Sequence, residues 1–260
     1  MNEVEAINRL GEFCGVRDVP ELTPGALRSR IGRDRVDVMA LFGGSILAGG
    51  EVLARAMESD IARKYIIVGG EGHTTPDLRR RMREVCPGLE TDALSEAELF
   101  DAWLRRRLGR GADALETAST NCGNNITLML QLLEREGMPC ESVILCQDAT
   151  MQRRMDAGLR RHRPDCTVVN YAAYRASVRQ TPEGLDYAER IRSMWDVPRY
   201  VSLLLGEIPR LRDYAEGYGP RGRGFIAHVD VPGEVLEAWE SLKTRYVVRR
   251  AKTDAGRRET

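Results

Sequence analysis

The sequence predicts an α/β protein with a Rossmann-like, three-layer α/β/α core, a mostly parallel five-stranded sheet and a small helical subdomain. Two observations predict this fold. Short apolar runs alternate with longer stretches of helical periodicity, as in βαβ units. Two of the runs end in paired glycines, which suits loops that turn from a strand toward a helix. The expected strands are 36–42, 65–68, 112–115, 142–146 and 166–171.

Helix-like stretches separate these strands. A first helix opens the chain, because Val4, Ile7, Leu10 and Cys14 fall on one face at helical spacing. The segment 16–35 is rich in proline and glycine, and we expect a loop with a short helix there. The remaining helices of the α/β region are expected at 51–63, 76–86, 95–108, 121–136 and 150–162.

The alternation of strands and helices stops near residue 185. The stretch 185–205 looks helical with a break near Pro198, a glycine-rich turn occupies 217–224, and a last helix is expected over 233–247. The predicted organisation has four parts. These are 1–34, an N-terminal helix and linker packed on the C-terminal subdomain; 35–184, a Rossmann-like ligand-binding domain; 185–250, a small helical subdomain with a basic glycine-rich loop; and 251–260, a flexible tail.

Composition narrows the functional classes. Lys plus Arg and Asp plus Glu both number 39, and this zero net charge disfavours nucleic acid as a partner. No apolar run is long enough to span a bilayer, and the first residues lack a signal-peptide pattern. The six cysteines form no C-x-x-C pair and fit no zinc spacing. We therefore expect a soluble, cytoplasmic protein with reduced thiols, no metal and no membrane partner; its oligomeric state stays open.

Ligands of an open parallel sheet bind beyond the carboxyl ends of its strands. Gly43-Gly44-Ser45 follows the first strand, where it either makes a tight turn or lets backbone N–H groups approach a ligand. Gly69 to Thr75 follows the second strand with three glycines, two threonines and His73, a candidate acid or base. The alternative for this second loop is a solvated segment in which Thr75 caps the next helix.

Two further loops carry polar side chains. Ser119 to Asn125 precedes a helix; capping needs only one or two of these side chains, and the excess indicates a pocket wall. In the segment 147–154, Asp148 precedes a helix with Arg153 and Arg154 in its first turns. Arginine is unfavourable there, so we expect an anionic partner, either a ligand or Asp148.

The segment 218–224 alternates glycine and arginine. Arg221 and Arg223 lie two residues apart, so they point the same way in an extended loop. One hypothesis is a mobile lid that closes over an anionic ligand near His73 or Asp148. The alternative is a solvated turn between helices.

Four segments closely resemble the YdcF-like branch of the bacterial YdcF/SanA/ElyC family. They are Gly-Gly-Glu-Gly-His-Thr-Thr (69–75), Ser-Thr-Asn-Cys-Gly-x-Asn (119–125), Gln-Asp-x-Thr-Met-Gln-Arg-Arg (147–154) and Gly-Tyr-Gly-Pro-Arg-Gly-Arg-x-Phe-Ile (217–226). The resemblance implies a Rossmann-like domain, a small helical domain and S-adenosylmethionine as the ligand. The family's polar positions fall here on His73, Glu96, Glu116, Ser119, Asn121, Asn125, Asp148 and Arg153. The family usually has glutamate where this chain has Asn124.

The sequence and the resemblance together predict a binder of S-adenosylmethionine or a related nucleotide, and an enzyme of unassigned reaction such as a transferase. One alternative is a hydrolase or phosphotransferase that clamps a phosphorylated metabolite with arginines. Another is a non-catalytic sensor, for which Asn124 is the support. The expected catalytic residues are His73, Glu96 and Asp148. The expected ligand-binding residues are Gly43, Gly44, Gly70, Gly72, Thr74, Glu116, Ser119, Asn121, Asn125, Gln147, Arg153, Arg154, Arg221 and Arg223.

Overall fold

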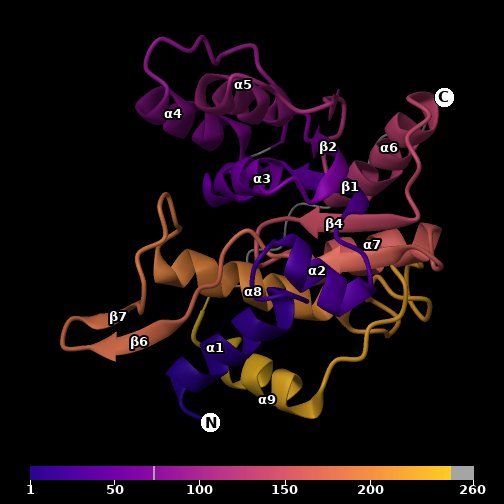
Figure 1. Ribbon diagram of the computed structural model, residues 1–260. Coiled ribbons are helices and arrows are strands. Elements are labelled where there is room, and N and C mark those ends of the chain that lie inside the picture. The colour runs from indigo at the N-terminus through magenta and orange to yellow at the C-terminus, as the bar shows by residue number, and fades with distance from the viewer. Residues whose placement is uncertain (73, 247–260) are drawn as a thin grey trace, which may run out of the picture.

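The computed structural model describes residues 1–72 and 74–246, and it confirms the α/β class with a five-stranded parallel sheet (Figure 1). The strand order is β3-β2-β1-β4-β5, and each neighbouring pair is parallel. Every residue of β1 is buried, because helices cover both faces of the sheet. The strands are β1 (Val36–Phe42), β2 (Ala62–Val68), β3 (Ala114–Glu116), β4 (Ser142–Cys146) and β5 (Thr167–Asn170).

Alternate residues of β1 pack into two separate apolar layers. Val38, Ala40 and Phe42 pack with α6 (Cys122–Arg135) and α7 (Gln152–His162) on one face. Met39 and Leu41 face the opposite layer, which contains α3 (Ala48–Glu58) and α5 (Glu96–Leu108). The helix α4 (Thr75–Val85) packs against α5. The result is the three-layer arrangement expected from the alternation of strands and helices.

The N-terminal helix lies against the C-terminal helices (Figure 1). The helix α1 (Glu3–Cys14) packs on α8 (Val197–Leu211) and α9 (Gly233–Leu242), and Arg9 pairs with Glu234 at 3.0 Å. The short helix α2 (Pro24–Ile31) has a Thr23 cap and ends at Gly32 in the left-handed conformation. Within the described part of the chain, no helix combines the length and apolar character needed to cross a bilayer.

The region after β5 differs from the sequence-based expectation. A hairpin of β6 (Val178–Thr181) and β7 (Gly184–Tyr187) crosses the expected domain boundary at 184/185. The expected helix from 185 begins only at Val197, where Asp196 caps it. Pro198 lies in the first turn, where proline is favourable, so it starts this helix rather than breaking it. The last helix ends at Leu242, and the predicted tail 251–260 lies outside the described residues.

The order of the strands creates a switch point between β1 and β4. The chain moves from β1 to β2 and β3 on one side and then crosses to β4 and β5 on the other. Connections that leave the carboxyl ends of β1 and β4 therefore diverge, which opens a crevice where ligands of this fold class bind. The segments 43–45 and 147–148 follow these two strands.

Candidate ligand-binding site

The loops that follow β1, β2 and β3 approach one another closely because glycines line their contacts. A Cβ on Gly43 would lie 2.4 Å from Glu96 Oε2, and one on Gly70 would lie 2.3 Å from the Ser119 carbonyl oxygen. Gly43 and Gly70, predicted as ligand contacts, therefore have a packing reason for being glycine. Gly72 has room for a side chain, since the nearest atom to its added Cβ is 3.7 Å away.

Glu96 lies at this junction, at the first turn of α5. Its backbone N–H donates to the Gly70 carbonyl at 3.0 Å, which fixes the start of α5 against the loop after β2. Its Oε1 accepts hydrogen bonds from Thr75 Oγ1 at 2.9 Å and Thr74 Oγ1 at 3.3 Å. Burial raises the pKa of Glu96, and the two threonine hydroxyls oppose this shift. A carboxyl group held in this way is suited to general acid or base chemistry.

Asp148 follows β4 on the other side of the switch point. Its Oδ1 accepts from the Thr150 backbone N–H at 2.9 Å, from Thr150 Oγ1 at 2.7 Å and from the Tyr174 hydroxyl at 2.7 Å. Burial raises the pKa of Asp148, and these hydrogen bonds lower it. Tyr174 was not predicted from the sequence; its only signal is its place after the last strand of the sheet.

A small cavity lies between the ends of β1 and β4. Its volume is about 10 Å³, the space of roughly one water molecule. Gly44, Gln147 and Asp148 contribute to its wall, together with apolar side chains such as Phe100. The predicted residues Gly44, Gln147 and Asp148 are therefore brought together by the fold.

Three buried polar atoms at the strand ends have no hydrogen-bond partner among the described residues. They are Ser45 Oγ after β1, Glu116 Oε2 at the end of β3 and Gln147 Nε2 after β4. Glu116 Oε1 accepts from the backbone N–H groups of Ala118 and Ser119, and Gln147 Oε1 accepts from that of Asp148, so each side chain leaves its other atom free. A buried polar group left unpaired costs about 1–3 kcal/mol, so these atoms mark a place where a ligand or ordered water belongs.

The polar loop before α6 is largely used in capping. Asn121 Oδ1 accepts from the backbone N–H groups of Gly123 and Asn124, while Asn124 Oδ1 accepts from that of Asn121 at 2.9 Å. This reciprocal pair is a capping box, a role that glutamate commonly fills at the position of Asn124. Ser119 Oγ accepts from the Gly70 N–H at 3.1 Å, and Asn125 continues the helix. Asn124 therefore has a local structural role, and the sensor alternative loses its support.

The two arginines of α7 have partners within the protein. Arg153 donates through Nε to the Phe13 carbonyl, and its guanidinium lies 4.2 Å from the centre of the Phe13 ring. Arg154 makes two hydrogen bonds with Glu207 of α8, at 2.5 and 3.1 Å. The expected pairing with Asp148 is therefore wrong for Arg154, whose partner is Glu207.

The loop that carries Arg221 and Arg223 is held against α7 in this structure, and the lid hypothesis stays a prediction. Their loop is fastened to the second half of α7, because Ala227 N–H donates to the Ala157 carbonyl at 2.9 Å and Arg161 Nε donates to that of Gly224 at 3.2 Å. In Figure 1 this gold segment lies at the far end of α7, away from the connection between β7 and α8. The arginine clamp expected for a phosphorylated metabolite stays a prediction.

His73 lies outside the described residues, so its predicted catalytic role stays a prediction. Two residues near the loop after β1 were missed, Arg81 of α4 and Trp195 of the β7–α8 connection. Arg81 donates through Nη1 to the Ser45 carbonyl, and its guanidinium lies 4.8 Å from the centre of the Trp195 ring. A charged residue within a polar helix gave no signal of burial, and Trp195 fell in a stretch expected to be helical.

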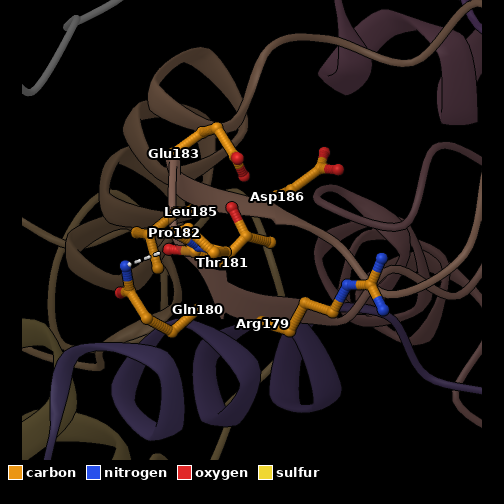
Figure 2. Close-up of a pocket in the computed structure, with 7 residues that line it drawn as sticks. All are labelled: Arg179, Gln180, Thr181, Pro182, Glu183, Leu185 and Asp186. Carbon is orange, nitrogen blue, oxygen red and sulfur yellow. Dashed lines mark hydrogen bonds between the residues drawn. The ribbon is translucent and has the colours of Figure 1, made fainter.

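A larger hollow of about 700 Å³ surrounds the β6–β7 hairpin (Figure 2). The hairpin alone lines it, with residues 179–183, 185 and 186. Figure 2 shows Arg179 and Asp186 extending to the same side of the hairpin, with no dashed line between Arg179 and the carboxylate of Asp186 or Glu183. This hollow contains none of the strand-end residues, so its size does not make it the better candidate.

The fold and the strand-end residues define the class: a Rossmann-like α/β protein with a candidate small-molecule site at the switch point. No family model matches the chain. Uncharacterized protein SCO4629 of Streptomyces coelicolor is 30% identical over 129 residues, or 50% of this chain. The matched segment spans about half the length of that relative, 51%. Across residues 1–72 and 74–246, no group of three or more His, Cys, Asp or Glu side chains is placed to hold a metal ion.

Proposed function

We propose that the carboxyl edge of the sheet binds a nucleotide-type small molecule, and that the protein is an enzyme of unassigned reaction, such as a transferase. The observation that carries this proposal is the set of unpartnered buried atoms of Ser45, Glu116 and Gln147. They lie at the ends of three strands, at the edge where this fold class binds ligands. S-adenosylmethionine, implied by the family resemblance, is the first candidate.

The charges at this edge suit such a ligand. Glu96, Glu116 and Asp148 form no ion pair with lysine or arginine in the described part of the chain. Carboxyl groups accept hydrogen bonds from ribose hydroxyls and amino groups and attract a sulfonium cation. The same carboxyl groups disfavour a multiply phosphorylated metabolite. S-adenosylmethionine would supply an alkyl group on a positively charged sulfur, and Glu96 or Asp148 would accept a proton from the second substrate.

The size of the cavity adds a condition for binding. About 10 Å³ holds roughly one water molecule and not a nucleoside. A ligand therefore enters only when a segment that covers this edge moves. The β7–α8 connection, residues 188–196, is the segment we expect to move, because its Trp195 packs over Arg81 beside the loop after β1.

Calorimetry and thermal unfolding with S-adenosylmethionine, S-adenosylhomocysteine and ATP test the proposal. At a hundredfold excess over the dissociation constant, a ligand stabilises the folded protein by about 2.7 kcal/mol. Glu116→Gln keeps an acceptor for the backbone N–H groups but removes the free carboxylate oxygen. We expect this variant to fold normally and to bind about 10- to 100-fold more weakly, as for a lost charged hydrogen bond.

The matched control is Glu183→Gln on the hairpin, an exposed carboxylate far from the strand ends, which should bind like the unchanged protein. No stabilisation by any of the three compounds at millimolar concentration would overturn the proposal. Equal affinities for Glu116→Gln and the control would remove Glu116 from the site.

A further inference from the structure

Three side chains with hydrogen-bond donors, Ser45, Arg81 and Trp195, lie at the loop that follows β1. Arg81 reaches from α4 to the Ser45 carbonyl oxygen, and Trp195 packs its ring against the Arg81 guanidinium. All three side chains are buried, with exposed fractions of 2% for Ser45 and 8% for Arg81 and Trp195. Arg199 lies against the same ring at 3.7 Å, so a second cation borders the cluster.

Two hydrogen-bond donors of this cluster have no partner in the described chain. Ser45 Oγ and Trp195 Nε1 are buried and have no hydrogen-bond partner among the described residues. Arg81 uses Nη1 for the Ser45 carbonyl and forms no ion pair with a carboxylate of the described chain. Asp77 lies 3.9 Å from Arg199 at this border; burial lowers the pKa of Arg81, and the charge of Asp77 opposes this shift. A buried cation beside two unpaired donors is costly unless an anionic group completes it.

We propose that Ser45, Arg81 and Trp195 form a subsite for the anionic oxygen group of the ligand, a carboxylate or a single phosphate. The inference rests on the proposed function only for the nucleoside part of that ligand. Ser45 directly follows Gly44, which lines the cavity beside Asp148, so the subsite adjoins the acidic strand ends. A ligand that spans both regions carries a donor-rich or cationic part and an anionic end.

The ligand class follows from this arrangement of charges. Carboxyl groups lie on one side, at Glu96, Glu116 and Asp148, and buried donors lie on the other. A nucleoside with an amino-acid side arm or with one phosphate has this distribution. Both kinds of nucleoside carry an anionic group, and matched pairs of compounds distinguish the carboxylate from the phosphate.

Calorimetry with two pairs of compounds tests the subsite. 5′-Methylthioadenosine and S-adenosylhomocysteine differ by the amino-acid end, and adenosine and AMP differ by one phosphate. We expect the anionic member of one pair to bind about tenfold or more tightly than its neutral partner. In the double variant Ser45→Ala/Trp195→Phe, which keeps the Arg81 cation, this ratio should fall severalfold. The pair that shows the effect identifies carboxylate or phosphate.

Stability separates this role from a merely structural one. The two substitutions remove donors that have no partner among the described residues, so beyond the packing lost when the indole becomes a phenyl ring they should cost no hydrogen bond. The matched control is Trp239→Phe, whose Nε1 donates to the Leu205 carbonyl at 3.0 Å and whose loss should lower the melting temperature. A larger loss of stability in Ser45→Ala/Trp195→Phe than in Trp239→Phe would overturn the subsite.

Inorganic phosphate, added at constant ionic strength, tests the subsite in the absence of a nucleoside, with the melting temperature as the measurement. Stabilisation that weakens in Ser45→Ala/Trp195→Phe supports the subsite even if every nucleoside fails to bind, a result that would overturn only the proposed function. Nucleoside binding with ratios near one, or ratios unchanged in the double variant, overturns the subsite and leaves the proposed function standing. No response to phosphate or any nucleoside overturns both.

Discussion

Glu96 holds its carboxyl group where ionisation is unfavourable. The side chain is 8% exposed and lies between Gly43 and the hydroxyls of Thr74 and Thr75. Burial raises its pKa above the ordinary value of 4.5, although the hydroxyls and Arg79 oppose the shift. Between the ordinary value and the higher folded-state pKa, the folded protein binds more protons than the unfolded chain. Its stability therefore falls as the pH rises through this window.

Glu96→Gln should remove this loss of stability. Glutamine still accepts the threonine hydrogen bonds but carries no charge, so at pH 8 we expect a gain on the order of 1 kcal/mol, or about 2–4 °C in melting temperature. At pH 4 the difference should vanish, because glutamate is then protonated in both states. Thermal unfolding between pH 4 and pH 8 measures this difference in stability for Glu96→Gln and for an exposed control, Glu90→Gln. A loss of stability at pH 8 would contradict it.

Single residues also show how far the sequence could define the site. Strand-end placement brought Gly44, Gln147 and Asp148 together as expected, because parallel strands share one carboxyl edge. The protein partners of Arg153 and Arg154 were not predicted, because Phe13 and Glu207 lie 140 and 53 residues away. Nothing local in the sequence indicates such long-range pairs, and the same limit hid the contact of Arg81 with Trp195.

At the scale of elements, local rules set the ends of α6. Asn121 and Asn124 satisfy each other's backbone N–H groups, and both remain at the surface or partly exposed. Because the position of Asn124 is the third of the helix, a longer carboxylate there makes the same reciprocal bond. An exchange of glutamate for asparagine at this position would therefore preserve the cap.

Substitutions at Asn124 test this explanation. Asn124→Glu should leave the free energy of unfolding within about 0.5 kcal/mol, since the capping box is kept and acid is favourable in the first turn. Asn124→Ala should cost about 1 kcal/mol, the typical value of a lost cap. Urea unfolding of both variants gives the numbers, and ligand affinity should change in neither. A large change of affinity in Asn124→Glu with unchanged stability would place residue 124 in the site instead.

Burial explains which elements the sequence predicted well. The strands 36–42 and 142–146 were predicted with their observed bounds, because every residue in them is buried and apolar runs stand out. The hairpin at 178–187 was missed, since each of its strands has four residues and only Val178 is buried. Short polar strands lack an alternating pattern, and Gly184 beside their turn is equally typical of a loop.

At the scale of the whole molecule, α1 connects parts of the chain that are far apart in sequence. It packs on α8 and α9, receives Arg153 of α7 at the Phe13 carbonyl, and contacts β6. Asn8 makes both hydrogen bonds with the backbone of Val178, accepting at 2.7 Å and donating at 3.0 Å. The hairpin is thus fastened to α1 at its base, and the connection whose Trp195 packs on Arg81 starts from this same hairpin.

Asn8→Ala should release the hairpin and, with it, the cover of the proposed site. The change leaves the N–H and carbonyl of Val178 without partners at a half-buried place, which costs about 1–3 kcal/mol. A two-stranded hairpin is marginal by itself, so we expect hydrogen exchange to speed up in 178–196 while β1 and β4 stay protected. The ligand should also associate faster, because 188–196 opens more readily.

The control is Gln180→Ala, whose side chain bonds to the neighbouring Thr181 carbonyl and should leave exchange unchanged. Faster exchange spread evenly over the sheet would show instead that α1 stabilises the molecule as a whole and that Asn8 has no special part in holding the cover.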